Sequence, residues 1–324
     1  MVKGLKMNIA VLMSTYNGEK YLTDQITSIF EQKDLNKSIH ITLFIRDDGS
    51  SDHTVSIIEQ LSKKYRIILL KDNLNNIGYV NSFFELIKSI TADYYFLSDQ
   101  DDIWGSKKVI THLNCYQESS CNEPTLIYTD LIKFGEATGT FFKDAGMDKR
   151  IFEDFRKVIF EPRLNGCLMS FNKEMRDVIA SALKLIDSRK HISGHDTFIV
   201  RIAAFSGKVK FAQGTSSTHD IMNYRVAGQN ISAKKRNRLR ALLDNCRWYS
   251  EHIDFATMML TNQKLLSLDP DKIDFLYQLQ EINETKFFLK RFFKGLSLIR
   301  YQKNTTYKAV WIIWLLWKPQ SKSL

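Results

Sequence analysis

Apolar and polar positions alternate regularly along the first hundred residues of the chain. Short apolar runs predict buried strands at 7–14, 39–47, 66–71 and 93–99. The stretches between them repeat their apolar residues with helical spacing, which predicts helices at 18–32, 51–65 and 76–90. Strands that alternate with helices form a mainly parallel sheet, because parallel neighbours need crossover connections. We therefore expect an α/β fold with helices on both faces of the sheet.

Polar clusters follow each of these predicted strands. They are STYNG at 14–18, DDGSSD at 47–52, DNLNNIG at 72–78 and SDQDD at 98–102. Any one of them could be a turn or a helix cap, and Asp52 suits the N-cap of the helix that follows it. The carboxyl ends of parallel strands are where open α/β sheets bind their ligands. Four such clusters at one edge therefore predict a binding site.

The alternation loosens after residue 105. Helices are expected near 105–118, 173–187 and 196–205, and the run TLIYTDLIKF at 125–134 is typical of a strand. Beyond residue 231 the chain becomes rich in helix-forming residues and basic clusters. We expect one domain at 1–230, with halves at about 7–104 and 105–230, and a docked helical extension at 231–324.

Composition and charge narrow the class of protein. The 324 residues are 44% hydrophobic and 25% charged, which is ordinary for a globular protein, and the net charge of +10 predicts attraction to nucleic acid, anionic membranes or phosphorylated substrates. The four cysteines lack paired CxxC spacing, so we expect reduced thiols in a cytoplasmic protein. The apolar run 9–13 is too short for the core of a signal peptide, so no export signal is expected.

Three carboxylates, Asp99, Asp101 and Asp102, lie within four positions after the last of the predicted strands. Mg²⁺ and Mn²⁺ prefer oxygen ligands, and one or two carboxylates together with substrate phosphates commonly hold Mg²⁺. In an extended segment, residues two apart project to the same side, so Asp99 and Asp101 can converge while Asp102 points elsewhere or caps the next helix. The alternative is a helix N-terminus that favours acidic residues.

Asp48 ends a predicted strand beside Gly49. This placement suits a carboxylate that accepts a hydrogen bond from the imide N–H of uracil or thymine. Simple turn formation, or an Asp47 side chain directed into the sheet, is the alternative interpretation.

These motifs together resemble a known family. STYNGEKYL, RDDGSSD, NIGYVNSF and LSDQDDIW are similar to the nucleotide-sugar-binding half of inverting family-two glycosyltransferases with the GT-A fold, and SDQDDIW resembles the bacterial rhamnosyltransferase branch. The resemblance extends over about residues 7–230. It implies a GT-A catalytic domain at 1–230 followed by the helical extension.

The resemblance also implies roles for individual residues. The nucleotide-sugar site would comprise Thr15, Tyr16, Asn17, Asp48, Asn81 and Asp99. Asp101 would be the metal ligand, with Asp99 and His219 as further candidates. The acceptor pocket would comprise Asn165, Gly166, His195 and Trp104. Asp196 would be the catalytic base.

Two of these positions have open alternatives. Asp196 opens a predicted helix, whose dipole favours the ionised form that a base needs, but aspartate there could also be a simple N-cap. Members of the resembled branch often carry a histidine shortly after a YR pair, where this chain has Ala227. His219 and Arg225 are the candidates to replace it.

The tail at 286–318 interleaves lysine and arginine with aromatic residues. Such a mixture suits contact with an anionic membrane surface, and core packing of the same aromatic residues is the alternative. The longest apolar run, at 309–317, has about half the roughly 20 residues that a spanning helix needs. No nucleic-acid-binding motif is present.

We therefore expect an inverting glycosyltransferase that depends on Mn²⁺ or Mg²⁺. It would transfer one sugar from a dTDP- or UDP-sugar, with dTDP-L-rhamnose as a candidate, to a hydroxyl of a growing, lipid-linked bacterial surface polysaccharide. The enzyme would be cytoplasmic and peripheral at the inner face of the cell membrane. The alternatives are a metal-dependent nucleotidyltransferase, which would release pyrophosphate, and a non-catalytic peripheral protein that binds sugar nucleotides or polyanions.

Overall fold

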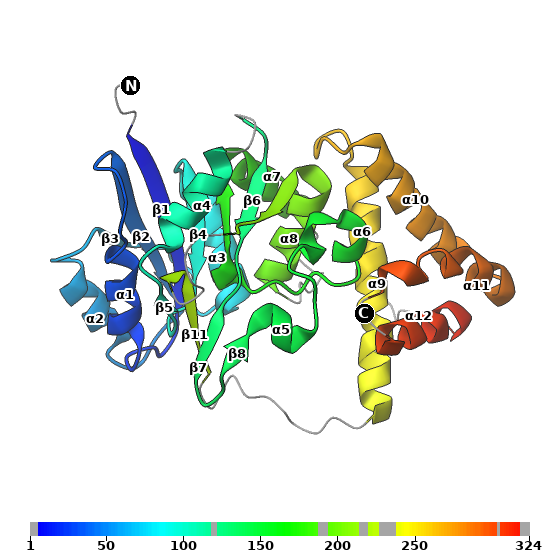
Figure 1. Cartoon of the computed structure of the whole chain (residues 1–324), viewed down its shortest axis with the longest axis horizontal. Coiled ribbons are helices and arrows are strands. Elements are labelled where there is room, and N and C mark those ends of the chain that lie inside the picture. The colour runs from blue at the N-terminus through cyan, green and yellow to red at the C-terminus, as the bar shows by residue number, and fades with distance from the viewer. Residues whose placement is uncertain are drawn as a thin grey trace.

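The computed structural model of the chain describes residues 6–117, 122–186, 194–213, 220–226, 238–302 and 305–317. Within these residues, seven strands form a central sheet in the order β10-β6-β9-β4-β1-β2-β3 (Figure 1). The strands are β1 (Met7–Thr15), β2 (Ile39–Asp47), β3 (Ile67–Leu69), β4 (Tyr94–Ser98), β6 (Thr125–Tyr128), β9 (Met169–Asn172) and β10 (Lys208–Phe211). β9 runs antiparallel to both of its neighbours, and the other pairs are parallel. The predicted mainly parallel sheet is confirmed.

Helices cover both faces of this sheet (Figure 1). They include α1 (Leu22–Phe30), α2 (Thr54–Leu61), α3 (Gly78–Ser89), α4 (Lys108–Gln117), α7 (Lys173–Leu183) and α8 (His195–Ser206). Because helices lie on both sides, β1 is apolar at consecutive positions, and its side chains at 9–13 are buried.

The described residues also contain a four-stranded sheet, in the order β5-β11-β7-β8. Its strands are β5 (Ile103–Trp104), β11 (Met222–Val226), β7 (Ile132–Gly135) and β8 (Gly139–Thr140). The single strand expected at 125–134 is therefore two strands in different sheets. Asp130 separates them: its buried carboxylate accepts a hydrogen bond from the Leu131 N–H at 2.9 Å, which turns the chain. An apolar run alone does not reveal such a break.

Short elements connect β8 to β9 along the chain. They are α5 (Phe141–Ala145), η1 (Ile151–Glu153), α6 (Phe155–Val158) and η2 (Gly166–Leu168). η2 leads directly into β9, which places its residues beside the end of β4.

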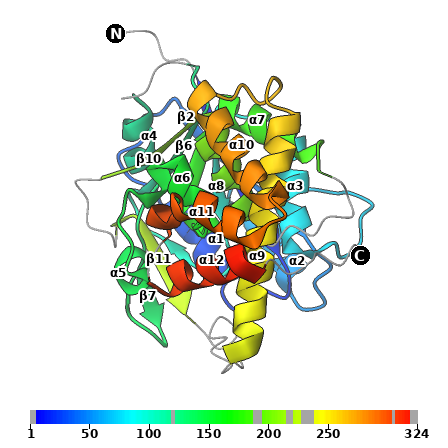
Figure 2. The ribbon, with the colours of Figure 1, turned by 90° about the vertical axis from the view of Figure 1, so that its right-hand side faces the viewer.

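The C-terminal part of the chain folds into helices that pack on the side of α6 and α8 (Figures 1 and 2). These are α9 (Arg238–Thr261), α10 (Pro270–Glu284), α11 (Phe288–Leu296) and α12 (Thr305–Trp317), with η5 (Ile299–Tyr301) between the last two. Aromatic pairs join the two parts, with ring centroids 5.5 Å apart for Phe155 and Phe275 and 5.3 Å for Phe160 and Trp311. The extension is thus docked, as expected. The proposed boundary at 230/231 falls in 227–237, outside the described residues.

Core packing accounts for part of the aromatic tail. Trp311 and Trp314 of α12 are buried and stack on each other with ring centroids 5.1 Å apart. None of the helices in the described ranges is both long enough and apolar enough to cross a membrane.

Candidate active site

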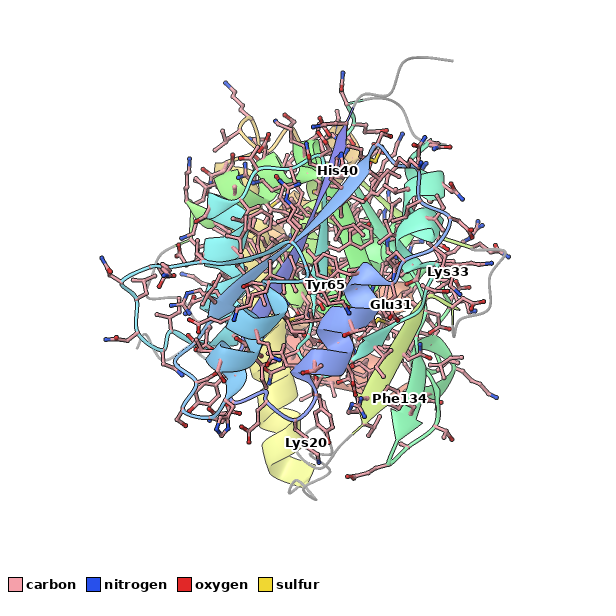
Figure 3. All side chains as sticks on the ribbon, turned by 90° about the vertical axis from the view of Figure 1, so that its left-hand side faces the viewer. Lys20, Glu31, Lys33, His40, Tyr65 and Phe134 are labelled. Atoms are coloured by element: carbon pink, nitrogen blue, oxygen red, sulfur yellow. The ribbon has the colours of Figure 1, made fainter. Side chains whose placement is uncertain are left out.

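Side-chain hydrogen bonds tie together the loops that follow β1, β2 and β4. The Gln100 amide accepts from the Tyr16 N–H at 2.9 Å and donates to the Tyr16 carbonyl at 3.1 Å. The Asn17 N–H donates to Ser50 Oγ at 2.9 Å, and Asn17 Oδ1 accepts from the Ser51 N–H at 2.8 Å. The prediction that these polar clusters meet at one edge is therefore confirmed for three loops. In Figure 3 this edge lies toward the bottom, near Lys20 and Phe134, whereas His40 marks the amino end of β2 at the top.

A buried ion pair organises the neighbouring loop before α3. Arg46 Nη1 donates to Asp48 Oδ1 at 2.7 Å, and Arg46 Nε donates to Asp72 Oδ2 at 2.8 Å. Asp48 also accepts from the backbone N–H groups of Ile77 and Gly78, at 2.8 and 2.9 Å. With both oxygens engaged and only 3% of the residue exposed, Asp48 holds the start of α3 against β2. Its contact with a nucleotide base stays a prediction.

We expect Arg46→Met to lower the free energy of unfolding by about 3 to 5 kcal/mol, because the change leaves the Asp48 carboxylate buried without its partner. Urea denaturation measures the loss. Lys88→Met is the matched control: it removes an ion pair with Glu85 at the surface, where a pair contributes about 0 to 1 kcal/mol. Equal losses in the two variants would contradict the structural role of Arg46.

The other residues predicted to bind the nucleotide differ in accessibility. Thr15 is buried, and its hydroxyl donates to Asp47 Oδ1 at 2.8 Å. Tyr16 and Asn81 are exposed, although the Asn81 amide donates to the Ile77 carbonyl at 2.8 Å. Asn17 is exposed as well, so Tyr16, Asn17 and Asn81 have side chains that can meet a ligand without rearrangement of the loops.

The acidic segment after β4 forms a compact cluster with a cysteine. Ligand atoms of Asp99, Asp102 and Cys167 lie within 4.8 Å of one another. This differs from the expectation that Asp102 points away from Asp99; Asp101 also lies near enough for its charge to raise the pKa of Asp99. The chain bends at Gln100 and Asp101, so the two-residue repeat of an extended segment does not apply.

Two cationic side chains lie beside this cluster. Lys108, the first residue of α4, is buried; its ammonium donates to the Cys167 carbonyl and lies 4.4 Å from the centre of the Trp104 ring. Arg225 of β11 donates its backbone N–H to Asp102 Oδ1 and its Nε to the Asp101 carbonyl, both at 2.9 Å. The Arg225 guanidinium lies 4.2 Å from the Tyr21 ring centre and 4.6 Å from that of Phe134. Lys108 comes from the helix that follows the acidic segment, whereas Arg225 comes from a strand more than a hundred residues away.

The Lys108 position was missed by sequence reasoning. Lys107 and Lys108 are adjacent, and only the register of α4 shows that Lys108 shares the buried face with Val109 and His112. The sequence did carry one signal for a buried lysine: in a helix, Lys108 falls on the same face as the apolar residues of this segment.

The electrostatics of the cluster favour an additional positive charge. Burial raises the pKa of Asp99 to about 7, and the charges of Asp101 and Asp196 add to the rise. Burial, followed by the charge of Asp99, raises the pKa of Asp102 well above its usual range. Burial also lowers the pKa of Lys108 to about 8. The carboxylates are therefore incompletely compensated by the protein alone.

A divalent cation fits this donor set. Apart from the nearby Cys167 thiol, no donor among the described residues faces the buried Oδ2 of Asp102. Carboxylate oxygens suit Mg²⁺ and Mn²⁺. Burial raises the pKa of the Cys167 thiol well above its usual range. Thiolates prefer softer metals than Mg²⁺ and Mn²⁺, so Cys167 suits the role of a neighbour better than that of a ligand for such an ion.

Asp196 lies in the first turn of α8 and faces the acidic cluster. Its Oδ1 accepts from the Thr197 N–H at 2.7 Å, and a Cβ on Gly194 would lie 2.5 Å from that oxygen, so a side chain at Gly194 would displace the carboxylate. Its charge contributes to the raised pKa values of both Asp99 and Tyr79. The fold thus brings together two acidic groups that lie almost a hundred residues apart in the sequence.

His195 adjoins Asp196 and packs between rings. It stacks on Phe83 with centroids 4.0 Å apart and meets the edge of Tyr79 at 5.9 Å. The ring is buried, and neither of its nitrogens has a hydrogen-bonding partner in the part of the chain that the structure describes. A Cβ on Gly166 would lie 2.8 Å from His195 Nε2. The structure therefore places two of the predicted acceptor-pocket residues in contact.

The remaining predicted residues are placed differently. Asn165 immediately precedes η2, and its carbonyl accepts from the Leu168 N–H at 3.0 Å. Trp104 is buried and packs against Phe96, so it lies behind the acidic cluster rather than on an open surface. His219 lies outside the described residues. Cys115 and Cys167 are not joined in disulfides, in agreement with the expected reduced cysteines.

Comparison with known proteins adds evidence of family. The sequence model described as Glycosyl transferase family 2 matches residues 10–120. The dTDP-rhamnosyl transferase RfbG of Shigella flexneri is 29% identical over 255 residues, covering 74% of this chain and 82% of that protein. An uncharacterized glycosyltransferase of Haemophilus influenzae is 31% identical over 280 residues, covering 80% of each chain. The chain belongs to glycosyltransferase family 2.

Solved structures agree on the fold of this glycosyltransferase. S. aureus TarS 1-349, in a complex with UDP-GlcNAc, aligns with a TM-score of 0.57 at 14% sequence identity, covering 96% of this chain and 82% of that one. At this identity the likeness concerns the fold, which is the GT-A arrangement of a mostly parallel sheet flanked by helices.

The buried imidazole of the glycosyltransferase predicts a dependence of stability on pH. Burial lowers the pKa of His195 from 6.5 to about 4, so in the folded protein the ring stays neutral while the unfolded chain binds a proton. The unfolded state therefore gains protons as the pH falls from 6.5 to about 4. Over that range we expect the stability of the wild type to fall, relative to His195→Gln, by on the order of 2 to 3 kcal/mol.

Urea denaturation at several pH values measures this difference. His53→Gln is the control for loss of a histidine at the surface, because 84% of its side chain is exposed. A difference between wild type and His195→Gln that does not change with pH would show that the His195 ring is hydrated in the folded protein.

Proposed function

We propose that this glycosyltransferase transfers a single sugar from a nucleoside diphosphate sugar to a hydroxyl of a growing, lipid-linked bacterial surface polysaccharide, with inversion and with the help of Mn²⁺ or Mg²⁺. The main support is the acidic cluster facing Asp196 at the carboxyl edge of the sheet, because carboxylates that could hold a cation lie there near a carboxylate that could act as a base. The similarity to a dTDP-rhamnosyl transferase makes dTDP-L-rhamnose the first donor to test, followed by UDP-sugars.

The nucleotide would lie across the loops after β1 and β2. We assign Thr15, Tyr16, Asn17, Asp48 and Asn81 to this part of the site, in two roles. Exposed Tyr16 and Asn81 would contact the nucleotide directly. Asn17 and Asp48, whose oxygens already bind neighbouring loops, would keep the loops in the binding conformation.

Asp101 and Asp99 would hold the divalent cation, with Asp102 as a further ligand suggested by its unsatisfied oxygen. When bound, such an ion neutralises charge that develops on the departing diphosphate. Lys108 and Arg225 would keep the carboxylates in place, the first through its buried charge and the second through its bonds to the Asp101 carbonyl and Asp102.

Asp196 would act as the base. An acceptor hydroxyl is a weak nucleophile near neutral pH, and a carboxylate in contact with it can take its proton as the new bond forms. The acceptor oxygen attacks the anomeric carbon, the bond from that carbon to the diphosphate oxygen breaks, and the proton passes to Asp196. One displacement of this kind inverts the anomeric carbon.

The acceptor would bind beside α8 and η2. His195 and Gly166 are in contact there, and the buried, neutral His195 ring would shape the wall of the pocket. Asn165 belongs to the same turn, and Trp104 would support the pocket from behind. A lipid-linked acceptor places the enzyme at the cytoplasmic face of the cell membrane as a peripheral protein.

A panel of sugar nucleotides tests this function. The purified protein is mixed with dTDP-, UDP- and GDP-sugars, with and without Mn²⁺ or Mg²⁺, and its melting temperature is measured. The sugar nucleotide that stabilises most is then tested for turnover, with and without acceptor glycan. Release of nucleoside diphosphate supports the proposal, release of pyrophosphate indicates a nucleotidyltransferase, and binding without turnover in the presence of acceptor indicates a non-catalytic binding protein.

A further inference from the structure

Helix α11 is oriented with its polar and small residues inward. The buried Arg291 donates to the Leu315 carbonyl at 2.6 Å, to the Leu316 carbonyl at 3.3 Å and to the Thr285 carbonyl at 3.2 Å. On the same face, the Gly295 carbonyl accepts from Trp311 Nε1 at 3.0 Å. Arg291 thus satisfies carbonyl groups in the last turns of α12, and the absence of a side chain at Gly295 allows close packing.

Four large apolar residues of this segment face outward instead, although Phe292 packs partly against the core. Their exposed fractions are 79% for Phe287, 52% for Phe288, 57% for Leu289 and 68% for Phe293. A surface helix of a globular protein normally buries its apolar stripe and exposes its charges. Here four large apolar side chains are exposed together, and three of them are phenylalanine. Such a patch indicates a surface that binds a protein or a membrane.

The charges around these residues are mainly positive. Lys286 and Lys290 are exposed and form no ion pair with any residue in the described ranges. Lys294 pairs with Glu281, and Glu284 accepts a hydrogen bond from Gln280 at 2.9 Å. Lys286 and Lys290 therefore leave this segment with an excess of positive charge, whereas Lys294, beside Phe293, is paired and the neighbouring acidic groups are engaged.

We propose that this surface, defined by Phe287, Phe288, Leu289, Phe293, Lys286 and Lys290 and called the α11 face, docks the enzyme on an anionic lipid bilayer. Phenylalanine rings enter the boundary between headgroups and acyl chains, while the lysines meet anionic headgroups. The inference rests on the proposed function in one respect: a lipid-linked acceptor requires the enzyme to work at a membrane. It deepens that proposal by assigning the contact to α11 and not to the tryptophans of α12.

The position of α11 permits this contact. It lies at the end of the molecule opposite α1 and α2, and it is in front of the other elements when that end faces the viewer (Figures 1 and 2). A second copy of the chain is a poorer partner, because a two-fold contact through this patch would bring its lysines close to their own counterparts. Charge complementarity therefore favours a lipid surface.

Vesicle co-sedimentation tests the proposal. Full-length protein is mixed with vesicles of phosphatidylcholine containing 30% phosphatidylglycerol, or of phosphatidylcholine alone. We expect binding to the anionic vesicles that weakens in high salt, and a loss of affinity of about tenfold or more in the triple variant Phe287→Ser, Phe288→Ser, Phe293→Ser. Lys286→Glu with Lys290→Glu should reduce binding to anionic vesicles in the same direction.

Leu265→Ser is the matched control, because Leu265 is 59% exposed but lies outside the α11 face. It should bind vesicles like the wild type, and all variants should keep the wild-type melting temperature because the changed side chains are exposed. Wild-type vesicle binding by the triple variant would overturn the proposal. So would a wild-type dimer that the triple variant converts to a monomer, because the α11 face would then be an interface between copies.

Sugar-nucleotide binding separates this inference from the proposed function. The triple variant should show the same thermal stabilisation by the donor as the wild type, since α11 is remote in the fold from the loops at the sheet edge. Loss of vesicle binding with intact donor binding supports the α11 face. If the wild type binds vesicles but has no transferase activity, the membrane role of the α11 face is supported and only the proposed function is overturned.

Discussion

Asp196→Asn is expected to lower kcat for sugar transfer by about two to four orders of magnitude, the usual contribution of a general base. The amide has the shape of the carboxylate and can still accept from the Thr197 N–H, so α8 should begin as in the wild type. What is lost is the capacity to take the proton of the acceptor hydroxyl. Binding of the sugar nucleotide does not require that capacity and should change little.

Steady-state kinetics with authentic acceptor measures the effect, and thermal stabilisation by the donor measures binding. Asp177→Asn is the matched control: this residue is also helical, but it pairs with Lys173 at the surface of α7. It should leave both quantities unchanged. Wild-type turnover by Asp196→Asn would show that another group accepts the proton.

Asp101→Asn should reduce kcat/KM by about two to three orders of magnitude, because a cation that stabilises the leaving diphosphate contributes several kcal/mol. The metal-dependent part of donor binding should fall as well. Titration of Mn²⁺ by electron paramagnetic resonance, with and without donor, gives a readout that is independent of turnover.

Variants of the neighbouring carboxylates show which of them bind the cation. Asp99 and Asp102 share the compact cluster with Cys167, so Asp99→Asn and Asp102→Asn serve as companions. If Asp101→Asn retains full Mn²⁺ affinity while the companion variants lose it, the ligand assignment moves from Asp101 to Asp102. If all three retain it, the cluster is not a metal site.

Much of the fold follows from periodicity. β2 occupies the predicted range 39–47, and β1 extends one residue beyond its predicted end. Buried strands and amphipathic helices carry different repeats because each must turn a defined set of side chains toward the same core. The split of 125–134 into β6 and β7 could not be predicted from periodicity. The turn between them depends on a hydrogen bond to the Asp130 carboxylate, which the apolar pattern does not reveal.

The site was also predictable only in part. Its polar loops could be recognised in the sequence because they follow predicted strands, and topology brings such loops together. The cations that compensate its carboxylates could not be recognised, since Lys108 is one of two adjacent lysines and Arg225 lies more than a hundred residues away. The aromatic tail was ambiguous for a similar reason: its composition is mixed throughout, and only packing separates the buried Trp311 from the exposed Phe293.

The sequence by itself determined the α/β class, the edge of the sheet where ligands belong and the residue types of the site, because local repeats and strand ends depend on neighbours along the chain. Tertiary structure alone decided that Asp102 joins Asp99, that Lys108 lies beside them, and that α11 presents its phenylalanines to the outside. Asp99, Asp102 and Lys108 are close in the sequence, but their burial and the opposite charges around them are set by packing against distant segments, such as those of Cys167 and Arg225. The outward face of α11 is likewise set by its packing on α12 and not by local pattern.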